Sequence, residues 1–214
     1  METLQASLDT ITRQSKATMP MNAFTVLENS IASLQQAGIA NGLPVGHKAR
    51  DFTLTNANGN QVNLYEELTK GPIILTFYRG SWCPYCNRQL RAYEEILPDI
   101  KKIGGSLIAI SPQTPDNSLT IKEKNDLSYE VVSDLKGLTA AKYNVLFDVP
   151  QEVKEVYNQF GLDLSEYNGG GNWVIPVPST FMIDETSRIR FSYVNPNYMQ
   201  RLEPEDLLTA LRNL

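Results

Sequence analysis

Cys83 and Cys86 are the two cysteines of the sequence, and they enclose Pro84 and Tyr85 in a Cys-x-x-Cys motif. The motif follows a short apolar run, residues 73–78, and precedes a segment whose apolar residues recur at helical spacing. A thiol at a helix N-terminus lies in the positive field of the helix dipole, which lowers its pKa and makes it nucleophilic. The three-residue spacing lets one thiol reach the other across a helical turn. The pattern therefore predicts a dithiol that cycles with an internal disulfide.

Arginine is concentrated around this motif. Arg79, Arg88 and Arg91 lie in a stretch without acidic residues, although the chain as a whole carries a formal net charge of -5. A nearby cation stabilises a thiolate, and Arg79, which is closest to the loop, is the candidate partner. Each of the other two is more typical of a solvated helix face. Two alternatives remain for the cysteines: inert buried thiols, or half of a metal site shared between two subunits.

The composition argues against several other chemistries. The chain has 214 residues with two cysteines and a single histidine, His47, so a complete tetrahedral zinc site is not expected. We predict neither a metal nor a cofactor. The net negative charge argues against nucleic acid or an anionic membrane surface as a general partner. No apolar run approaches the ~20 residues of a membrane span, and charges interrupt the first twenty residues, so we expect a soluble, cytoplasmic protein with reduced cysteines.

Two amphipathic helices are predicted in the first forty residues. Apolar residues recur at helical spacing over residues 4–11 and 24–34, with Asn22 as a plausible cap and Gly38 as a stop signal. We expect residues 1–44 to form an N-terminal helical extension. The simple interpretation is that its apolar faces pack against the main domain, and the alternative is an arm that forms a homodimer.

From residue 45 to residue 214 the pattern is that of one α/β domain. A hairpin with an Asn-Gly turn is followed by apolar runs that alternate with helical patterns, which is typical of a three-layer fold around a mixed sheet. Pro98 should kink or end the helix after the motif. The expected strands lie at residues 52–54, 61–64, 73–78, 107–110, 129–132, 180–183 and 189–193, and the expected helices at 85–103, 119–127, 138–143, 152–160 and after Pro204. The last two strands should be an antiparallel pair at the far side of the sheet.

Several segments together resemble a known family. They are residues 45–54, the strand end at 77–78, the stretch from Trp82 to Cys86, and residues 178–184. These segments are similar to the peroxiredoxin-like branch of the alkyl hydroperoxide reductase/thiol-specific antioxidant family. The resemblance implies a thioredoxin-like fold and thiol-dependent reduction of hydroperoxides or disulfides. It also implies an electron donor such as a thioredoxin or a low-molecular-weight thiol.

The sequence departs from the peroxiredoxin pattern at three places. In the alignment with that motif, Arg79 takes the place of its proline, Cys83 that of the activating threonine, and Cys86 that of the peroxidatic cysteine. The family's distal arginine falls at Pro178. Two groups that orient and polarise a peroxide are therefore missing, which argues against fast peroxidase chemistry.

A thioredoxin-type alignment assigns the roles differently. Trp82 precedes Cys83, which becomes the more exposed attacking thiol, and Cys86 becomes the resolving thiol. Val177 and Pro178 match the cis-proline loop, so we expect a cis bond there and backbone groups of Val177 that pair with an extended substrate. The buried acid that thioredoxins place before the motif is absent, and Cys83 is favoured as the attacking residue.

The loop before Pro178 offers one further candidate. Trp173 follows three glycines, Gly169–Gly171, and could cover the dithiol or bind a substrate side chain; the alternative is a satellite core. At this point hydroperoxide reduction and disulfide exchange remain open. A third hypothesis is a redox-sensing binding module, in which the disulfide state moves this loop and gates a partner site without turnover.

Overall fold

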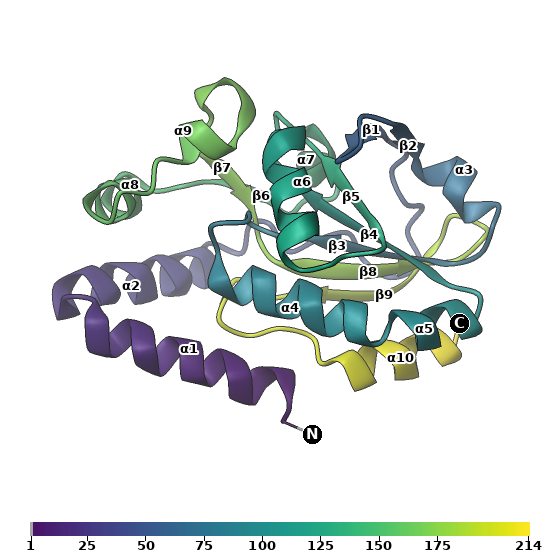
Figure 1. The fold of residues 1–214 in the computed structure, drawn as a ribbon, viewed down its shortest axis with the longest axis horizontal. Helices are drawn as coiled ribbons and strands as arrows, with labels where there is room; N and C mark the ends of the chain where they lie inside the picture. Colours follow the sequence, from purple (N-terminus) through teal and green to yellow (C-terminus); the bar gives the residue numbers. More distant parts are fainter. Residues whose placement is uncertain (1) are drawn as a thin grey trace.

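The computed structural model describes residues 2–214, and its centre is a seven-stranded mixed sheet (Figure 1). The strand order is β2-β1-β5-β4-β3-β8-β9. The strands are β1 (Thr53–Asn56), β2 (Gln61–Asn63), β3 (Ile73–Phe77), β4 (Ser106–Ser111), β5 (Glu130–Ser133), β8 (Ser179–Ile183) and β9 (Ile189–Val194). β3, β4 and β5 are parallel, whereas β1 and β2, at one edge, and β8 and β9, at the other, run antiparallel to their neighbours.

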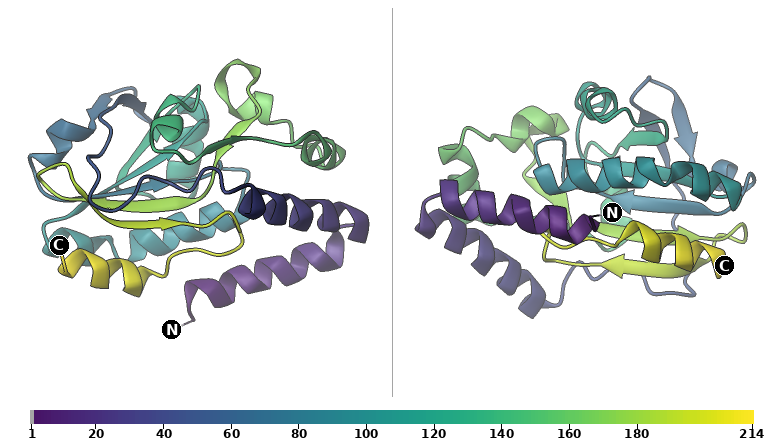
Figure 2. Two further views of the ribbon diagram at one scale, coloured as in Figure 1. Left: turned by 180° about the vertical axis from the view of Figure 1, so that it is seen from behind. Right: turned by 60° about the horizontal axis from the view of Figure 1, so that its bottom comes forward.

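Helices cover both faces of the sheet, which makes three layers (Figures 1 and 2). One core lies between the sheet and α4 (Pro84–Glu95), α5 (Leu97–Lys102), α6 (Pro115–Lys124) and α10 (Pro204–Arg212). The core on the other face is closed by α3 (Leu64–Leu68) and α7 (Leu138–Lys142). All five residues of β3 are buried, as expected for a central strand, and the expected three-layer α/β architecture around a mixed sheet is present.

The boundaries follow local chemistry. The predicted helix after the motif is divided at Ile96, because Pro98 lacks the N–H that a continuous helix would need there. α6 begins at Pro115, four residues earlier than predicted, with Thr114 as its side-chain cap. The expected hairpin forms, with Leu54 opposite Val62.

A second, two-stranded sheet was not predicted. β6 (Leu146–Asp148) pairs antiparallel with β7 (Val174–Pro176), and between them lie α8 (Gln151–Gln159), α9 (Leu164–Tyr167) and the 3-10 turn η1 (Gly169–Gly171). The three glycines that precede Trp173 form the short turn η1, which lies between α9 and β7.

The N-terminal extension packs against the rest of the same chain. It consists of α1 (Leu4–Thr18) and α2 (Met21–Ala37), and α2 begins after Pro20, so the expectation of an Asn22 cap is wrong. Gly38 ends α2 in the left-handed conformation that suits glycine. Leu4 and Leu8 of α1 are buried in the core that also contains α4, and Figure 2 shows α1, α4 and α10 on one side of the sheet.

Glu203, just before α10, holds the start of α1. Its carboxylate accepts hydrogen bonds from the backbone N–H groups of Leu4 and Gln5 at 3.0 and 2.7 Å. A carboxylate at a helix N-terminus satisfies unpaired donors and complements the helix dipole. Across residues 2–214, no helix has the length and apolar character that crossing a bilayer requires.

Candidate active site

The Cys-x-x-Cys motif lies where β3 ends and α4 begins. Cys83 is the N-cap residue of α4, Pro84 is its first helical residue, and Cys86 lies in its first turn. The backbone N–H of Cys86 donates to the carbonyl of Cys83 at 3.1 Å. Both thiols are free, and their residues are buried, with exposures of 1% for Cys83 and 0% for Cys86. Cys83, expected to be the more exposed of the two thiols, is thus almost as buried as Cys86.

Arg79, the candidate partner of a thiolate, lies against both thiols. Its guanidinium Nη1 is 3.9 Å from the Cys83 sulfur, and its backbone N–H donates to the Cys86 sulfur at 3.4 Å. The guanidinium also donates to the Tyr157 hydroxyl and lies 3.9 Å from the centroid of Tyr198 and 4.8 Å from that of Trp82. Arg79 is thus enclosed by aromatic rings and has 4% of its surface exposed.

Arg201 is a site residue that the sequence analysis missed. It belongs to the segment between β9 and α10, is 4% exposed, and places Nη2 3.6 Å from the Cys86 sulfur. Its Nε donates to the amide oxygen of Gln89 at 2.8 Å, and Nη1 donates to the carbonyls of Tyr198 and Gln200. Arg201 and Cys86 are 115 residues apart in the sequence, so no local sequence pattern predicts their contact.

The other two arginines near the motif do not contact the thiols. Nε of Arg88 donates to the hydroxyl of Ser7 on α1 at 3.0 Å, and Arg91 is exposed on α4. The interpretation of these residues as part of a solvated helix face fits Arg91, whereas Arg88 links α4 to the N-terminal extension.

The charge balance of the site favours a thiolate. Within residues 2–214, neither Arg79 nor Arg201 forms a salt bridge with a carboxylate. A buried cation needs an anionic partner, and the two sulfurs are the groups available to supply one.

Cys86 is the thiol that ionises first. Burial raises its pKa, but a hydrogen bond from the Cys83 thiol and the charges of Arg201 and Arg79 outweigh burial, so the pKa of Cys86 lies well below its usual value. Burial and the Cys86 thiolate raise the pKa of Cys83 well above its usual value. Ionisation of one thiol thus disfavours ionisation of the other, as in any strongly coupled pair.

A cavity of about 180 Å³, called the thiol cavity below, opens onto Cys83. Cys83 and Arg79 line it together, whereas Cys86 does not. Its apolar walls come from both N-terminal helices and from α8, through Met19, Phe24, Leu27, Val156 and Phe160. An engineered apolar cavity of ~150 Å³ binds benzene, so this volume suffices for a small apolar group.

Aromatic residues of the motif hold the wall of this cavity. Trp82 lines it and packs on the Tyr157 ring, with 5.6 Å between centroids. Tyr85 is buried, its ring lies edge-on to Tyr198, and its hydroxyl is 3.1 Å from that of Thr12 on α1. Pro84 is exposed at the rim.

Val177 and Pro178 differ from the expectation. The peptide bond between them is trans, so the predicted cis bond is wrong. Both residues are buried, and the N–H of Val177 donates to the carbonyl of Val145 at 2.7 Å. Val177 continues the pairing of β7 with the chain near β6, so its N–H is used internally and is not free to bind an incoming strand.

Trp173 lies away from the thiols. It is half-buried and packs against the satellite core beneath α8, its carbonyl accepts from the N–H of Val149 at 2.9 Å, and Lys154 lies 5.8 Å from its ring centroid. It does not line the thiol cavity. The satellite-core alternative is therefore the correct one, and the expectation of a rim over the dithiol is wrong.

A metal site within one chain would need several ligating side chains close together. Within the part of the chain that the structure describes, no three His, Cys, Asp or Glu side chains gather as they would around a metal ion. The chemistry of the site rests on two thiols and two guanidinium groups.

Comparison with known proteins decides the family. A model of the AhpC/TSA family matches residues 45–192, which is more than half of the chain. This chain belongs to the AhpC/TSA family. The matched region contains β1 to β8, the first four residues of β9, both cysteines and Arg79, and it excludes α1, α2 and Arg201.

Curated relatives of this AhpC/TSA member carry two kinds of names. The thiol-disulfide oxidoreductase ResA of Geobacillus kaustophilus is 29% identical over 146 residues, which cover 68% of this chain and 67% of that protein. A putative peroxiredoxin of Mycobacterium tuberculosis is 29% identical over 153 residues, covering 72% of this chain and 86% of that protein. Among solved structures, the peroxidoxin BcpB of Mycobacterium tuberculosis superposes with a TM-score of 0.65 at 20% identity, covering 80% and 98% of the two chains.

The family assignment makes this chain a thiol oxidoreductase of an antioxidant family with a peroxiredoxin-like, thioredoxin-like fold. The predictions of family, fold class and enzyme class are confirmed. The choice between a peroxide and a disulfide as the substrate is not confirmed, because this chain is similar to relatives of both kinds.

Proposed function

We propose that this protein reduces hydroperoxides through reversible oxidation of Cys83 and Cys86 to an internal disulfide. The observation that carries the proposal is the setting of the Cys83 sulfur, which faces a small apolar cavity with the Arg79 guanidinium beside it. A hydroperoxide can enter such a cavity, whereas a disulfide within a folded polypeptide is too bulky to reach a sulfur that is 1% exposed.

The reaction begins with a proton transfer between the two cysteines. Cys83 passes its proton to the Cys86 thiolate, and the Cys83 sulfur attacks the terminal oxygen of the hydroperoxide. The O–O bond breaks, the oxygen remains on Cys83 as a sulfenic acid, and the alkoxide takes the proton back from Cys86 to leave as an alcohol. The regenerated Cys86 thiolate then attacks the Cys83 sulfur and expels hydroxide, which is protonated by solvent. One hydroperoxide and two thiols thus become an alcohol, water and a disulfide.

The two arginines supply the positive charge that this sequence needs. Arg79 lies beside the attacking sulfur, where negative charge develops on the departing oxygen, and Arg201 stabilises the Cys86 thiolate. The family pattern places an arginine at the position of Pro178. In this chain Arg201 provides a buried cation at the site instead. This supports peroxide chemistry in spite of the departures in the motif.

Exchange with a small disulfide is the second candidate function. The Cys-x-x-Cys spacing and the resemblance to ResA proteins favour it. Against a polypeptide substrate stands the N–H of Val177, which is already paired within the chain. In either reaction a thiol reductant, a thioredoxin or a low-molecular-weight thiol, returns the disulfide to the dithiol, as a reducing cytoplasm would allow.

A coupled assay tests the proposal. Hydrogen peroxide, cumene hydroperoxide and oxidised glutathione are compared at equal concentration with one dithiol reductant, and the Cys83→Ser variant gives the background rate. We expect many turnovers with both peroxides and a lower rate with the disulfide. Turnover with the disulfide alone would contradict the proposal in favour of exchange, and a single oxidation without turnover would favour a redox-sensing module.

A further inference from the structure

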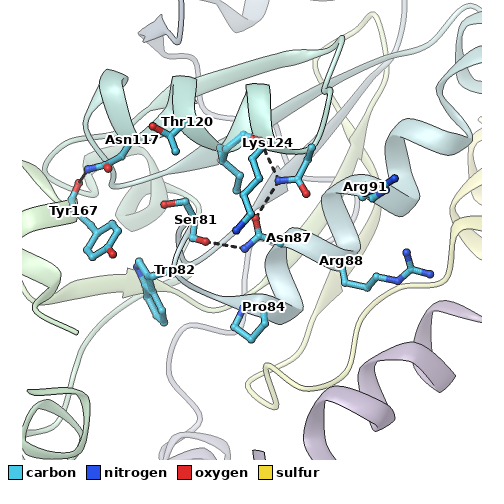
Figure 3. Close-up of a pocket in the computed structure, with 12 residues that line it drawn as sticks. Ser81, Trp82, Pro84, Asn87, Arg88, Arg91, Asn117, Thr120, Lys124 and Tyr167 are labelled. Atoms are coloured by element: carbon cyan, nitrogen blue, oxygen red, sulfur yellow. Dashed lines mark hydrogen bonds between the residues drawn. The ribbon is translucent and has the colours of Figure 1, made fainter. Parts of the chain in front are cut away.

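A second cavity lies on the other side of the motif, between α4 and α6 (Figure 3). Its volume is about 740 Å³, which is within the range of small-molecule sites. Trp82 and Pro84 line both this cavity and the thiol cavity, so the two are separated only by the motif itself. We call the larger one the basic groove.

The basic groove is positively charged on a protein that is acidic overall. Arg88 and Arg91 of α4 and Lys124 of α6 line it, and no Asp or Glu is among its lining residues. Arg91 and Lys124 are exposed, and neither forms a salt bridge with another of residues 2–214. The remaining lining groups are mostly amides and hydroxyls, which suit a polar ligand with negative charge.

Hydrogen bonds link the floor of the basic groove to the backbone of Cys83. The side-chain amide of Asn125 donates to Asn87 at 3.0 Å, and Asn87 donates to the carbonyls of Ser81 and Cys83 at 2.7 and 2.9 Å, as Figure 3 shows in part. This network fixes the groove relative to the Cys83 backbone.

The scale of the groove fits a small peptide thiol. At a rise of ~1.5 Å per residue, Arg88 and Arg91 lie about 7 and 12 Å along α4 from Cys83. A di- or tripeptide thiol has its carboxylates at comparable distances from its sulfur. Such a molecule could place its carboxylates on the cations while its thiol reaches over the exposed Pro84 to Cys83.

We propose that the basic groove binds the carboxylates of a low-molecular-weight thiol that reduces the Cys83–Cys86 disulfide. This inference rests on the proposed function and names its electron donor by chemical class. The thiolate of the donor attacks the Cys83 sulfur and Cys86 leaves as a thiolate beside Arg201; a second donor thiol then attacks the donor's sulfur in the mixed disulfide. Two donor thiols become one donor disulfide, and the protein dithiol is restored.

The experiment compares thiols of different charge. Glutathione serves as the anionic probe and 2-mercaptoethanol as the neutral one, and each reduces the pre-formed protein disulfide under pseudo-first-order conditions. In the double variant R91Q/K124Q, we expect the ratio of the second-order rate constants, glutathione over 2-mercaptoethanol, to fall about tenfold, because each exposed ion pair contributes only modestly. The same ratio should fall in the wild type when salt is raised.

A matched control removes two charges elsewhere. Lys101 and Lys102 are exposed on α5 and do not line the groove, so K101Q/K102Q should leave the ratio unchanged. An unchanged ratio in R91Q/K124Q would overturn the proposal, as would a loss confined to reduction by an acidic thioredoxin, which would assign the groove to a protein donor. The rate of disulfide formation with peroxide is measured separately, so failure of the proposed peroxidase activity is distinguishable from failure of this inference.

Discussion

The Arg201 guanidinium and the Cys86 thiolate stabilise each other's charge. A guanidinium buried without an anion costs several kcal/mol, and the Cys86 sulfur lies 3.6 Å from Nη2 of Arg201. The folded dithiol form is therefore more stable with Cys86 ionised, which is the same statement as a lowered pKa. In the proposed mechanism the Cys86 thiolate first accepts the proton of Cys83 and later attacks the Cys83 sulfur. A lowered pKa of Cys86 therefore makes the pair reactive at neutral pH.

Replacing Arg201 should raise the pKa of the Cys83/Cys86 pair. In R201Q the pKa should move up toward the ~8.5 of a free thiol, so the rate of alkylation at pH 7 falls about tenfold and recovers at high pH. The measurement is the rate of iodoacetamide modification against pH. Arg212, exposed at the end of α10, provides the control R212Q, and a pKa in R201Q equal to that of the wild type would contradict the assignment.

The two cysteines should behave differently when each is replaced. Because Cys83 lines the thiol cavity and Cys86 does not, C86S should form a sulfenic acid on Cys83 that dimedone traps, more slowly than the wild type because the proton acceptor is gone, whereas C83S should react with peroxide more slowly still. Intact mass after one equivalent of peroxide provides the readout. Rapid oxidation of C83S together with an inert C86S would reverse the roles.

The wild type should form its disulfide within one molecule. Cys83 caps α4 and Cys86 lies in its first turn, so internal attack outpaces encounter with a second chain. We expect the oxidised protein to run as a monomer on a non-reducing gel and to lose two hydrogens by mass. A disulfide-linked dimer as the main product would be the contrary result.

At the scale of elements, the parts predicted from sequence are those with strong local signals. The buried run of β3, the Asn-Gly hairpin, the break before Pro98 and the αL glycine after α2 all follow from residue chemistry within a few positions. β6 and β7 are only three residues each and pair across more than twenty residues, so no local period reveals them. Arg201 was missed for the same reason, since only tertiary packing brings it to Cys86.

Replacement of Gly71, two residues before β3, should destabilise the fold. Gly71 has φ of +146°, and a Cβ there would lie 2.2 Å from the carbonyl oxygen of Gly104. G71A should therefore lower the free energy of unfolding by about 2 kcal/mol or more, from strain together with the backbone clash. Gly59 has φ of +85° and open space around it, so G59A provides a control that costs only about 1 kcal/mol. Equal losses in urea unfolding would contradict the role of the clash.

At the scale of the whole molecule, α1 and α2 pack against the part of the chain that holds the two cysteines. They supply walls of the thiol cavity and apolar residues of the main core, and Thr12 lies within hydrogen-bonding distance of the Tyr85 hydroxyl. The packing interpretation of the extension therefore describes this chain, whereas a homodimer through these helices stays a prediction.

Truncation of a single buried side chain of α1 should lower the free energy of unfolding as much as a core mutation does. Leu8 is fully buried, so L8A should lower the free energy of unfolding by about 2–5 kcal/mol. Met21, 86% exposed in α2, provides the control M21A, with an expected change within about 0.5 kcal/mol. A loss below 1 kcal/mol for L8A in urea unfolding would indicate that α1 is detached in solution.

The short stretch that holds Arg201 and Glu203 has a practical consequence for expression of this protein. A recombinant fragment cut at the limits of the family match, residues 45–192, would retain both cysteines and every strand except the last two residues of β9. It would lose the cation beside Cys86, the helices α1, α2 and α10, and one wall of the thiol cavity. Inactivity of that fragment would therefore reflect where it was cut, and only the full chain gives a fair measure of the enzyme.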